Sequence, residues 1–362
     1  MPKIAEIQTI PFRLPMRGSL HWGRAGRLDA LEHVLVRLVT EGGQVGLAEA
    51  PPRPTIYGET PESIQAIIRN YLAPALIGLE IDRVELANQR MAAVANNPTA
   101  KGAIDIALHE ALAASRGMNL GQWLGATQKR IRVSYILGMA SRESMLAEAR
   151  AVYERGVRVL KVKVGRDFEH DLALLRDLLA EFAGSDLALY ADANECFTPG
   201  NAPDRLRRLA GLGLLYVEEP LPVRLLRERA ALQRAGFLPL IADDSAFTPD
   251  DLARELAFDT FDILNIKTAR TGYFHSRQML EAALARGKGV MVGSQASSTL
   301  GAVRAAAFAG LAGVSHPSEL SFFLKLEDEI VDRPLAIREG YIDLDEALEI
   351  GLDEDRLARC RR

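Results

Sequence analysis

Val157-Arg-Val-Leu-Lys161-Val-Lys163-Val-Gly165 is the stretch that decides the fold. A short β-branched run that ends in glycine predicts a buried strand of a parallel sheet. Lys161 and Lys163 are two residues apart, so both side chains lie on the same face of this strand. A parallel sheet is covered on both faces, and two ammonium groups there require a chemical reason. Their repulsion also lowers the cost of deprotonating one of them. The alternative is a strand end whose lysines extend to solvent.

The same arrangement, an apolar run that ends in polar residues, recurs along the chain at intervals of about 25 residues. The runs end at Asp192-Ala-Asn194, Glu218-Glu219, Asp243-Asp244, Lys267 and Ser294-Gln295. Helical patterns lie between and after them, over residues 171–181, 204–212, 225–235, 248–257 and 276–286. A repeat of strand, functional residue and helix predicts an α/β barrel with its catalytic groups at one face. One acidic strand end can simply cap the next helix, but three in succession favour a site.

Length and composition are those of an ordinary soluble protein. The 362 residues fit a barrel plus a smaller domain, and 48% are hydrophobic and 25% charged. A net charge of −4 and the lack of a basic stripe argue against a nucleic-acid partner. The two cysteines are too few for a disulfide framework, which favours the cytoplasm. No apolar run has the length of a membrane span, so we expect no membrane association.

The first 125 residues predict a separate α+β domain. Strand patterns cover residues 4–13 and 33–39, and helical patterns cover 61–73, 82–95 and 98–116. The barrel is then expected over residues 126–322, with its first strand at 131–136. The last segment, 323–362, is expected to pack back on the first domain.

Two segments of the first domain are predicted to be loops that recognise the substrate. They are residues 15–27, with His21, Trp22 and Arg24, and residues 51–58, with Tyr57. Their cationic and aromatic side chains can contact the part of a substrate that the barrel does not. The alternative is that they are ordinary surface residues or anchor the domain on the barrel.

The three acidic strand ends predict a site for a hard divalent cation. Mg²⁺ prefers an all-oxygen set of ligands, Mn²⁺ is a possible substitute, and the lack of His and Cys among these residues argues against zinc. The pattern leaves open which member of each acidic doublet is the ligand. Lys163 and Lys267 come from strands on opposite sides of the acids, where either could remove the proton α to a metal-bound carboxylate. The alternative is that the acids and lysines only form salt bridges.

Several motifs together resemble the enolase superfamily. They are Lys161-Val-Lys163, Asp192-Ala-Asn194, Val217-Glu218-Glu219-Pro220, Ala242-Asp243-Asp244-Ser245 and Asn265-Ile-Lys267. Within it they resemble the muconate-lactonizing subgroup of the mandelate racemase/muconate lactonizing enzymes, over essentially the whole chain. The resemblance implies a (β/α)7β TIM-like barrel with an N-terminal α+β capping domain completed by the C-terminal tail. It also implies proton abstraction through an enediolate that Mg²⁺ stabilises.

The resemblance also implies residue roles. Lys163 is the expected base, Lys161 its modulator and Lys267 the acid/base of the opposite face, while Glu319 resembles the eighth-strand glutamate of muconate lactonizing enzymes. The expected metal ligands are Asp192, Glu218 and Asp243. Asn194 and Asp244 are expected to support these residues, and Ser294 and Gln295 to face the substrate.

Two departures from the family pattern affect the prediction of activity. Asp244 stands where many relatives carry glutamate, and residues 293–298 replace a stretch that usually contains Met-Leu-Glu on the substrate side. The paired-aspartate motif that dipeptide epimerases carry on the eighth strand is missing, which disfavours that activity.

The prediction is therefore a muconate cycloisomerase-like enzyme that acts on a small carboxylate, in a homo-oligomer. The alternatives are a racemase or epimerase of an N-substituted amino acid, an o-succinylbenzoate synthase-type dehydratase, and a binding protein on a retired barrel. No acid or lysine of the motifs is missing, which disfavours the last.

Overall fold

The computed structural model describes residues 1–22 and 26–362, and its centre is a parallel sheet that curls into a barrel. The sheet has the order β11-β10-β9-β8-β7-β6-β5, so each strand pairs with its neighbour in sequence. Its strands are β5 (Tyr135–Leu137), β6 (Val159–Lys163), β7 (Ala188–Asp192), β8 (Val217–Glu218), β9 (Leu240–Ala242), β10 (Ile263–Ile266) and β11 (Gly289–Val292). The predicted fold class is confirmed.

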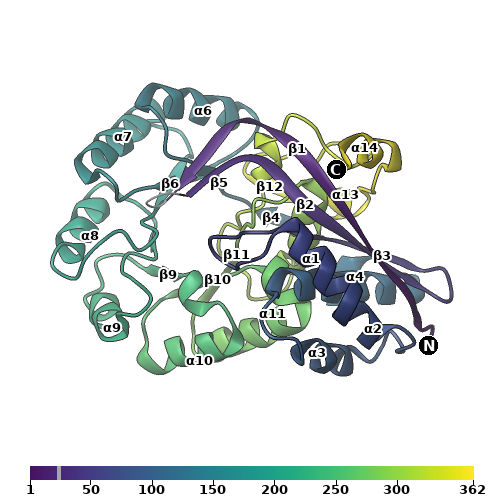
Figure 1. Ribbon diagram of the computed structural model, residues 1–362. Coiled ribbons are helices and arrows are strands. Elements are labelled where there is room, and N and C mark those ends of the chain that lie inside the picture. Colours follow the sequence, from purple (N-terminus) through teal and green to yellow (C-terminus); the bar gives the residue numbers. More distant parts are fainter. Residues whose placement is uncertain (23–25) are drawn as a thin grey trace.

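Helices follow the strands and surround the sheet, as Figure 1 shows for α6 to α11. They are α6 (Arg142–Glu154), α7 (Phe168–Glu181), α8 (Ala202–Gly211), α9 (Leu226–Arg234), α10 (Pro249–Phe258), α11 (Thr268–Ala285) and α12 (Thr299–Ala309). The expected helix over 276–286 begins earlier, at Thr268, and is broken at Gly272, where φ is 62°. That backbone conformation favours glycine, because a Cβ there is sterically strained.

The segment around Ser318 closes the ring between the first and last strands. Ser318 N donates to Arg132 O at 2.9 Å, and Ser134 N donates to Ser318 O at 2.8 Å. On the other side Glu319 N donates to Val292 O at 2.8 Å. The barrel is therefore completed by a segment with few ladder bonds, and Glu319 joins the ring of strand ends.

The prediction of one first barrel strand over 131–136 is wrong. Two short strands occupy this region, and β4 (Arg130–Arg132) pairs antiparallel with β12 (Tyr341–Asp343) outside the barrel. Only β5 belongs to the barrel sheet. Ile131, Val133 and Tyr135 are all buried. The alternation in the sequence therefore continues from β4 into β5, and it does not show that the two strands pair with different partners.

The N-terminal region is an antiparallel sheet with helices beside it. Its strands are β1 (Ile4–Trp22), β2 (Gly26–Thr40) and β3 (Val45–Ala50). Its helices are α1 (Pro61–Ile67), the π-helical turn η1 (Ile68–Leu72), α2 (Ala73–Leu76), α3 (Val84–Ala92), α4 (Pro98–Ser115) and α5 (Leu120–Leu124). The expected α+β character of this region is confirmed.

The prediction of a loop over 15–27 is wrong, because both strands of a long hairpin run through it. Leu20 pairs with Leu28 and His21 with Arg27, after a register shift between Pro15 and Leu20. One proline and three glycines favour a loop in the sequence, whereas the structure accommodates Pro15 and Gly18 at this irregularity. The hairpin extends over the barrel mouth, where Met139 N donates to His21 O at 2.9 Å.

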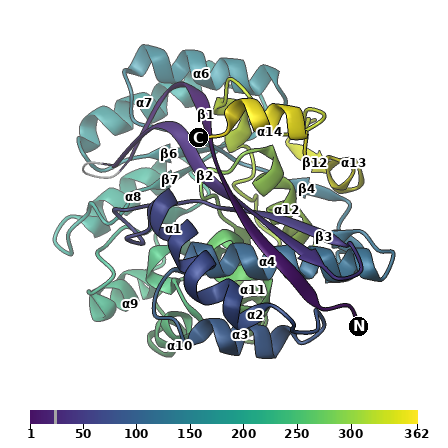
Figure 2. The ribbon, with the colours of Figure 1, turned by 45° about the vertical axis from the view of Figure 1, so that its right-hand side comes forward.

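The C-terminal segment packs on this hairpin, as expected. It contains η3 (Phe322–Lys325), α13 (Leu344–Leu348) and α14 (Glu354–Cys360), and α14 lies near β1 in Figure 2. Arg362 N donates to Pro11 O at 3.1 Å, and Glu354 forms an ion pair with Arg37. The domain limits near residues 125 and 322 stay predictions.

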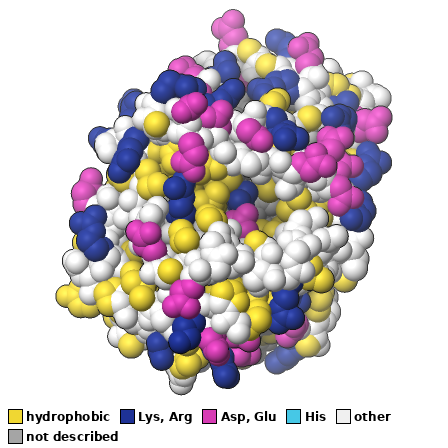
Figure 3. Space-filling model, turned by 90° about the vertical axis from the view of Figure 1, so that its right-hand side faces the viewer, with side chains coloured by type: hydrophobic (Ala, Val, Ile, Leu, Met, Phe, Trp, Pro, Cys, Tyr) yellow, Lys and Arg dark blue, Asp and Glu magenta, His cyan; other side chains and the backbone are white. Residues whose placement is uncertain are grey.

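The surface carries mixed charges. On the face shown in Figure 3, acidic and basic side chains are interspersed around the edge, and hydrophobic side chains gather toward the middle around a hollow. Within the described part of the chain, no helix is both long and apolar enough to cross a membrane.

Candidate active site

Lys161 lies at the centre of a buried cluster of carboxylates at the C-terminal ends of the strands. Its Nζ lies 2.6 Å from Glu218 Oε1, 2.6 Å from Glu319 Oε1 and 3.0 Å from Asp192 Oδ2. Burial alone lowers the pKa of this ammonium, but the three negative charges outweigh it and hold the pKa well above the ordinary value of lysine. With these partners Lys161 stays charged. Repulsion by Lys163 therefore does not make Lys161 the neutral member of the pair.

Lys163 extends from the same face of β6 toward the mouth of the barrel. Its Nζ donates to Asp192 Oδ2 at 2.5 Å and to Asn194 Oδ1 at 3.0 Å. Burial raises the pKa of Asp192, but Lys161 and Lys163 together reverse this and hold it well below the usual range. Asn194 therefore contacts the lysine that Asp192 binds, and its supporting role stays a prediction.

Lys267, directly after β10, forms the opposite side of the cluster. Its Nζ donates to Asp243 Oδ2 at 2.5 Å, while Asp244 Oδ1 is 4.0 Å away. Asp244 instead accepts from Arg270 Nη1 at 2.7 Å, and Arg270 Nη2 donates to Asp243 O at 2.9 Å. Asp244 therefore binds Arg270, and Arg270 binds the carbonyl oxygen of Asp243. Asp243 is the residue that accepts a hydrogen bond from Lys267.

The structure distinguishes the members of the Glu218-Glu219 doublet. Glu218 faces the cluster, whereas Glu219 turns away and pairs with Arg229 at 3.3 Å. Glu219 Oε1 also accepts from the backbone N–H groups of Asp243 at 2.7 Å and Ser245 at 2.9 Å. Burial raises the pKa of Glu219 to about 7. Glu219 therefore fixes the strand end that carries Asp243.

Two buried residues that the sequence analysis gave no role complete the cluster. Tyr190 OH donates to Glu319 Oε1 at 3.1 Å, and Asn265 Nδ2 lies 3.4 Å from Glu218 Oε2. Asn265 stands two residues before Lys267, so the period of a strand could have identified it. Tyr190 stands two residues before Asp192 in the same way.

Comparison with known proteins identifies the family of this cluster. Residues 144–356 match the enolase C-terminal domain-like family, and residues 13–125 match the N-terminal domain of mandelate racemase/muconate lactonizing enzymes. The chain belongs to the mandelate racemase/muconate lactonizing enzyme family of the enolase superfamily.

Named relatives of the chain are enzymes. An L-Ala-D/L-Glu epimerase of Bacillus subtilis is 32% identical over 85% of each chain, and muconate cycloisomerase 1 of Rhodococcus opacus is 29% identical over 88% of each. The crystal structure of a muconate lactonizing enzyme from Mucobacterium smegmatis with muconolactone superposes with a TM-score of 0.94. It is 38% identical and covers 99% of this chain and 100% of its own. The chain is therefore an enzyme of the enolase superfamily, in the isomerase and epimerase group.

Mg²⁺ is the general cofactor of this family, and the donor set here fits its chemistry. Asp192, Glu218 and Asp243 supply carboxylate oxygens from three adjacent strand ends, and Asp243 Oδ1 is buried without a hydrogen-bond partner in the described part of the chain. Among the described residues, no three His, Cys, Asp or Glu side chains are already gathered around one point as a metal site. Lysines hold these carboxylates instead, as the distances above show.

A hollow of about 90 Å³ above the cluster is the place where this family's chemistry can act. The charged lining comes from Arg53, Lys161, Lys163, Lys267, Asp243, Asp244 and Glu319, and the polar lining from Asn194, Ser294 and Gln295. Its apolar lining comes from Leu20, Leu28, Ile56, Ile136, Ala296 and Phe322. Pockets for drug-sized ligands usually measure about 300 Å³ or more, so this hollow is small by comparison.

Ser294 and Gln295, which are predicted to face the substrate, both line this hollow. Ser294 N donates to Glu319 Oε2 at 3.0 Å, which fixes the carboxylate that also binds Lys161. Gln295 O accepts a hydrogen bond from Arg53, another lining residue to which the sequence analysis gave no role. Burial lowers the pKa of Arg53 to about 10. Arg53 Nη1 also lies 3.5 Å from Nε2 of His33, on β2. Arg53 therefore contacts both the N-terminal sheet, at His33, and the barrel, at Gln295.

The predicted loop residues have different positions. The ring of Tyr57 packs edge-on against Phe247, with centroids 5.2 Å apart, and lines a neighbouring cavity instead of this hollow. His21 contributes its backbone to the contact with Met139 and is not among the lining residues. Arg24 and the side chain of Trp22 lie outside the described part of the chain.

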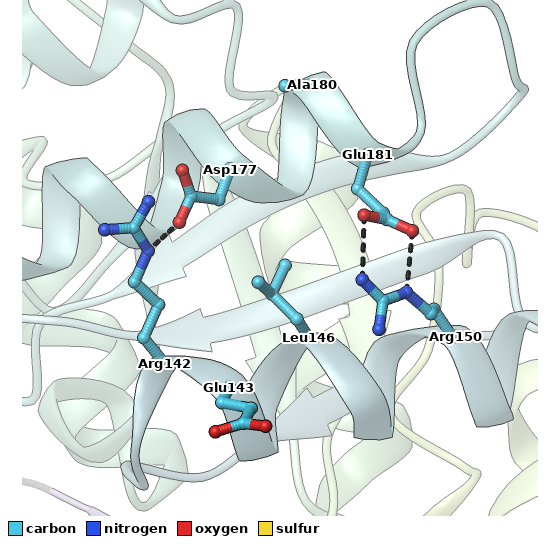
Figure 4. Close-up of a pocket in the computed structure, with 7 residues that line it drawn as sticks. All are labelled: Arg142, Glu143, Leu146, Arg150, Asp177, Ala180 and Glu181. Carbon is cyan, nitrogen blue, oxygen red and sulfur yellow. Dashed lines mark hydrogen bonds and ion pairs between the residues drawn. The ribbon is translucent and has the colours of Figure 1, made fainter.

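A wider hollow of about 670 Å³ on the outer side of α6 and α7 has no such chemistry (Figure 4). Its charged groups pair with one another: Arg150 donates to both oxygens of Glu181 at 2.6 and 2.9 Å, and Arg142 pairs with Asp177. These residues lie on helices away from the strand ends, so the groove is not the active site of this family.

Proposed function

We propose that the enzyme is a muconate cycloisomerase-like isomerase that moves the proton α to a substrate carboxylate. The observation that carries this proposal is the position of Lys163 and Lys267. Both line one hollow, from β6 and from the end of β10, with the carboxylates of the intervening strands between them. One lysine can deliver the proton to the α-carbon, or remove it in the reverse direction, while the other supplies positive charge on the opposite side of the bound carboxylate.

Mg²⁺ would be held by Asp192, Glu218 and Asp243, with Mn²⁺ as a possible substitute. When bound, the ion supplies positive charge that stabilises the substrate carboxylate as it gains electron density. The protein's own groups do the remaining work. Lys163 and Lys267 hold or accept the proton at Nζ, and Lys161 stays charged among its three carboxylate partners.

The apolar side chains over the hollow exclude water from the reacting carbon. Leu20 and Leu28 come from the hairpin, Ile56 from the following loop and Phe322 from the segment after Glu319. Excluding water strengthens each charge interaction within the site and protects a charged intermediate from quenching.

The eighth-strand segment favours a substrate without an ammonium group, and hence cycloisomerisation over dipeptide epimerisation. Both oxygens of Glu319 are engaged, by Lys161 and by Ser294 N, and Ser321 Oγ donates to Ser134 O at 2.7 Å. Glu319 therefore has no oxygen left without a partner for an ammonium ion, and Ser321 has no carboxylate. The 38% identical muconate lactonizing enzyme supports the same assignment.

Racemisation or epimerisation of an N-acyl amino acid is the second candidate, because the two lysines can serve opposite faces of one carbon. Dehydration of the o-succinylbenzoate synthase type shares the same first step. A small carboxylate substrate, a homo-oligomeric assembly and a cytoplasmic location complete the proposal, supported by the kind of enzymes to which the chain is related.

Turnover of cis,cis-muconate in deuterium oxide with Mg²⁺, followed by proton NMR, tests the proposal. We expect lactone with one deuterium at the carbon α to the carboxylate, and no lactone from Lys163→Ala or Lys267→Ala. A matched assay with N-acyl amino acids measures deuterium in recovered substrate. Exchange there without any lactone from muconate would replace the first candidate by the second.

A further inference from the structure

A second cavity, of about 500 Å³, lies behind the wall of the active site, where the N-terminal region meets the barrel. We name it the interdomain cavity. Ala92 on α3 and Lys101 on α4 line it from one side, and Phe247 and Arg270 from the barrel side. Ile56 lines both this cavity and the active-site hollow, so the two cavities share a wall at this residue.

The charge of the lining is positive. Lys101, Arg270 and His275 line the interdomain cavity, and none of the described lining residues is Asp or Glu. Glu59, an acid whose charge acts on Lys101, is engaged elsewhere: it accepts from Thr99 N at 3.0 Å and from Ala100 N at 3.2 Å. Lys101 Nζ also donates to Val94 O, which leaves two of its three N–H groups for a ligand in the cavity.

Arg270 supplies a buried donor that is not satisfied. Its side chain is 1% exposed, and its two Nη atoms bind Asp244 Oδ1 and Asp243 O. Its Nε is buried and has no hydrogen-bond partner among the described residues. An unpaired buried donor on a charged group is costly. The ring of Phe247 lies over the guanidinium, 4.3 Å from its Cζ, so a ligand acceptor reaches Nε when this ring shifts. The rest of the lining includes apolar side chains such as Met91 and Phe247.

We propose that the interdomain cavity is a second binding site, which takes a small organic carboxylate with an apolar or aromatic body. The carboxylate would accept hydrogen bonds from Arg270 and Lys101, and the apolar body would lie against Met91 and Phe247. A volume of about 500 Å³ is within the range of small-molecule sites, which combine apolar walls with a few polar groups.

Occupancy of this site affects the active site through Arg270. The same guanidinium holds Asp244 and the carbonyl of Asp243, and Asp243 is the partner of Lys267. A carboxylate on Arg270 competes for its charge and so changes the charge balance around Lys267. This consequence, unlike the binding itself, rests on the proposed function.

Fluorine NMR titration of the full-length protein with 4-fluorobenzoate, in Mg²⁺, tests the binding directly. Ala92→Trp fills the cavity from an exposed position, and Lys101→Gln removes one cation. The matched controls are Ala93→Trp, at the adjacent exposed position outside the lining, and Lys3→Gln, at an exposed lysine far along the chain. Melting temperatures of all four variants show that each is folded.

We expect two binding events in the wild-type protein and in both controls. In Ala92→Trp one event is lost, and in Lys101→Gln it weakens at least about tenfold, as for loss of one charge-assisted hydrogen bond. In a steady-state assay of the wild-type enzyme, 4-fluorobenzoate should inhibit with a competitive and a noncompetitive component. Ala92→Trp should keep the competitive component and lose the noncompetitive one. A single event that Lys163→Ala removes, or two events that both cavity variants retain, would overturn the proposal. The titration does not depend on which carboxylate the enzyme converts, so it fails independently of the proposed function.

Discussion

Replacement of Lys161 by methionine tests whether this lysine is the counter-charge that holds the active site together. Its ammonium lies 2.6 to 3.0 Å from three buried carboxylates. Removing one partner of a buried ion pair costs about 3–5 kcal/mol, because the remaining charge stays buried. Unfolding entropy scales as about 2.1 cal/mol/K per residue, which gives roughly 0.8 kcal/mol/K for 362 residues. We therefore expect a melting temperature about 4–6 °C lower in Lys161→Met, measured by calorimetry in EDTA at pH 7.

The pH dependence of this difference has a definite sign. The folded-state pKa of Asp192 is depressed by its lysines, so the stability it contributes is present above its unfolded pKa and lost as pH falls through the folded value. The folded-state pKa of Lys161 is raised, so its contribution persists at all pH values below its unfolded pKa. The difference between wild type and variant should therefore be largest near neutral pH and shrink in acid.

Lys129→Met is the matched control for this experiment. Lys129 pairs with Asp345 at 2.8 Å, but both side chains are more than half exposed. Exposed ion pairs contribute about 1 kcal/mol or less, which corresponds to roughly 1 °C here. If Lys161→Met melts no lower than Lys129→Met, the cluster is not held by Lys161 and the reasoning is refuted.

The other predictions concern the cation, the proton and a second acid. Mg²⁺ at 100 times its Kd should stabilise the protein by about 2.7 kcal/mol in thermal scans, and Glu218→Gln should lose most of this shift; coincident scans with and without Mg²⁺ would exclude the site. Lys163→Ala and Lys267→Ala should keep the Mg²⁺ shift and lose α-proton exchange in deuterium oxide; full activity in either excludes its role. Burial raises the pKa of Glu329 to about 7, so its charging destabilises the fold as pH rises from about 4.5 through 7. Glu329→Gln keeps an acceptor for Thr299, so its melting temperature should exceed that of wild type at pH 8 and match it near pH 5; equal values at pH 8 would contradict this.

The sequence was sufficient for the barrel and for the groups at its strand ends. Period-two patterns place Lys161 and Lys163 on one face, and repeated strand ends predict that Asp192 and Asp243 meet. These arrangements depend on local geometry, which the sequence records. Periodicity alone did not separate Glu218 from Glu219, because two adjacent residues at the end of a strand can each turn toward the centre.

The contacts that the sequence did not reveal are those between distant segments. Arg53 reaches Gln295 across 242 positions of the chain, and its role depends on how the N-terminal sheet lies over the barrel. The loop prediction for residues 15–27 failed for a similar reason. Leu20 pairs with Leu28 in a hairpin that lies over the mouth of the barrel, whereas the one proline and the glycines of this segment favour an irregular structure.

Other distant contacts connect the N-terminal region to the helix that follows Lys267. Asp105 on α4 is buried, and its Oδ2 accepts from Tyr273 N at 2.5 Å and Phe274 N at 3.1 Å, at the break in α11. Gly102 on the same helix approaches so closely that a Cβ there would lie 2.5 Å from Ala269 O. The Gly102 contact falls on the first turn of α11, which begins directly after Lys267, and the Asp105 contacts fall at the break that follows it. Because α4 also packs on β3, these contacts tie the N-terminal sheet to the barrel helix that follows the second lysine.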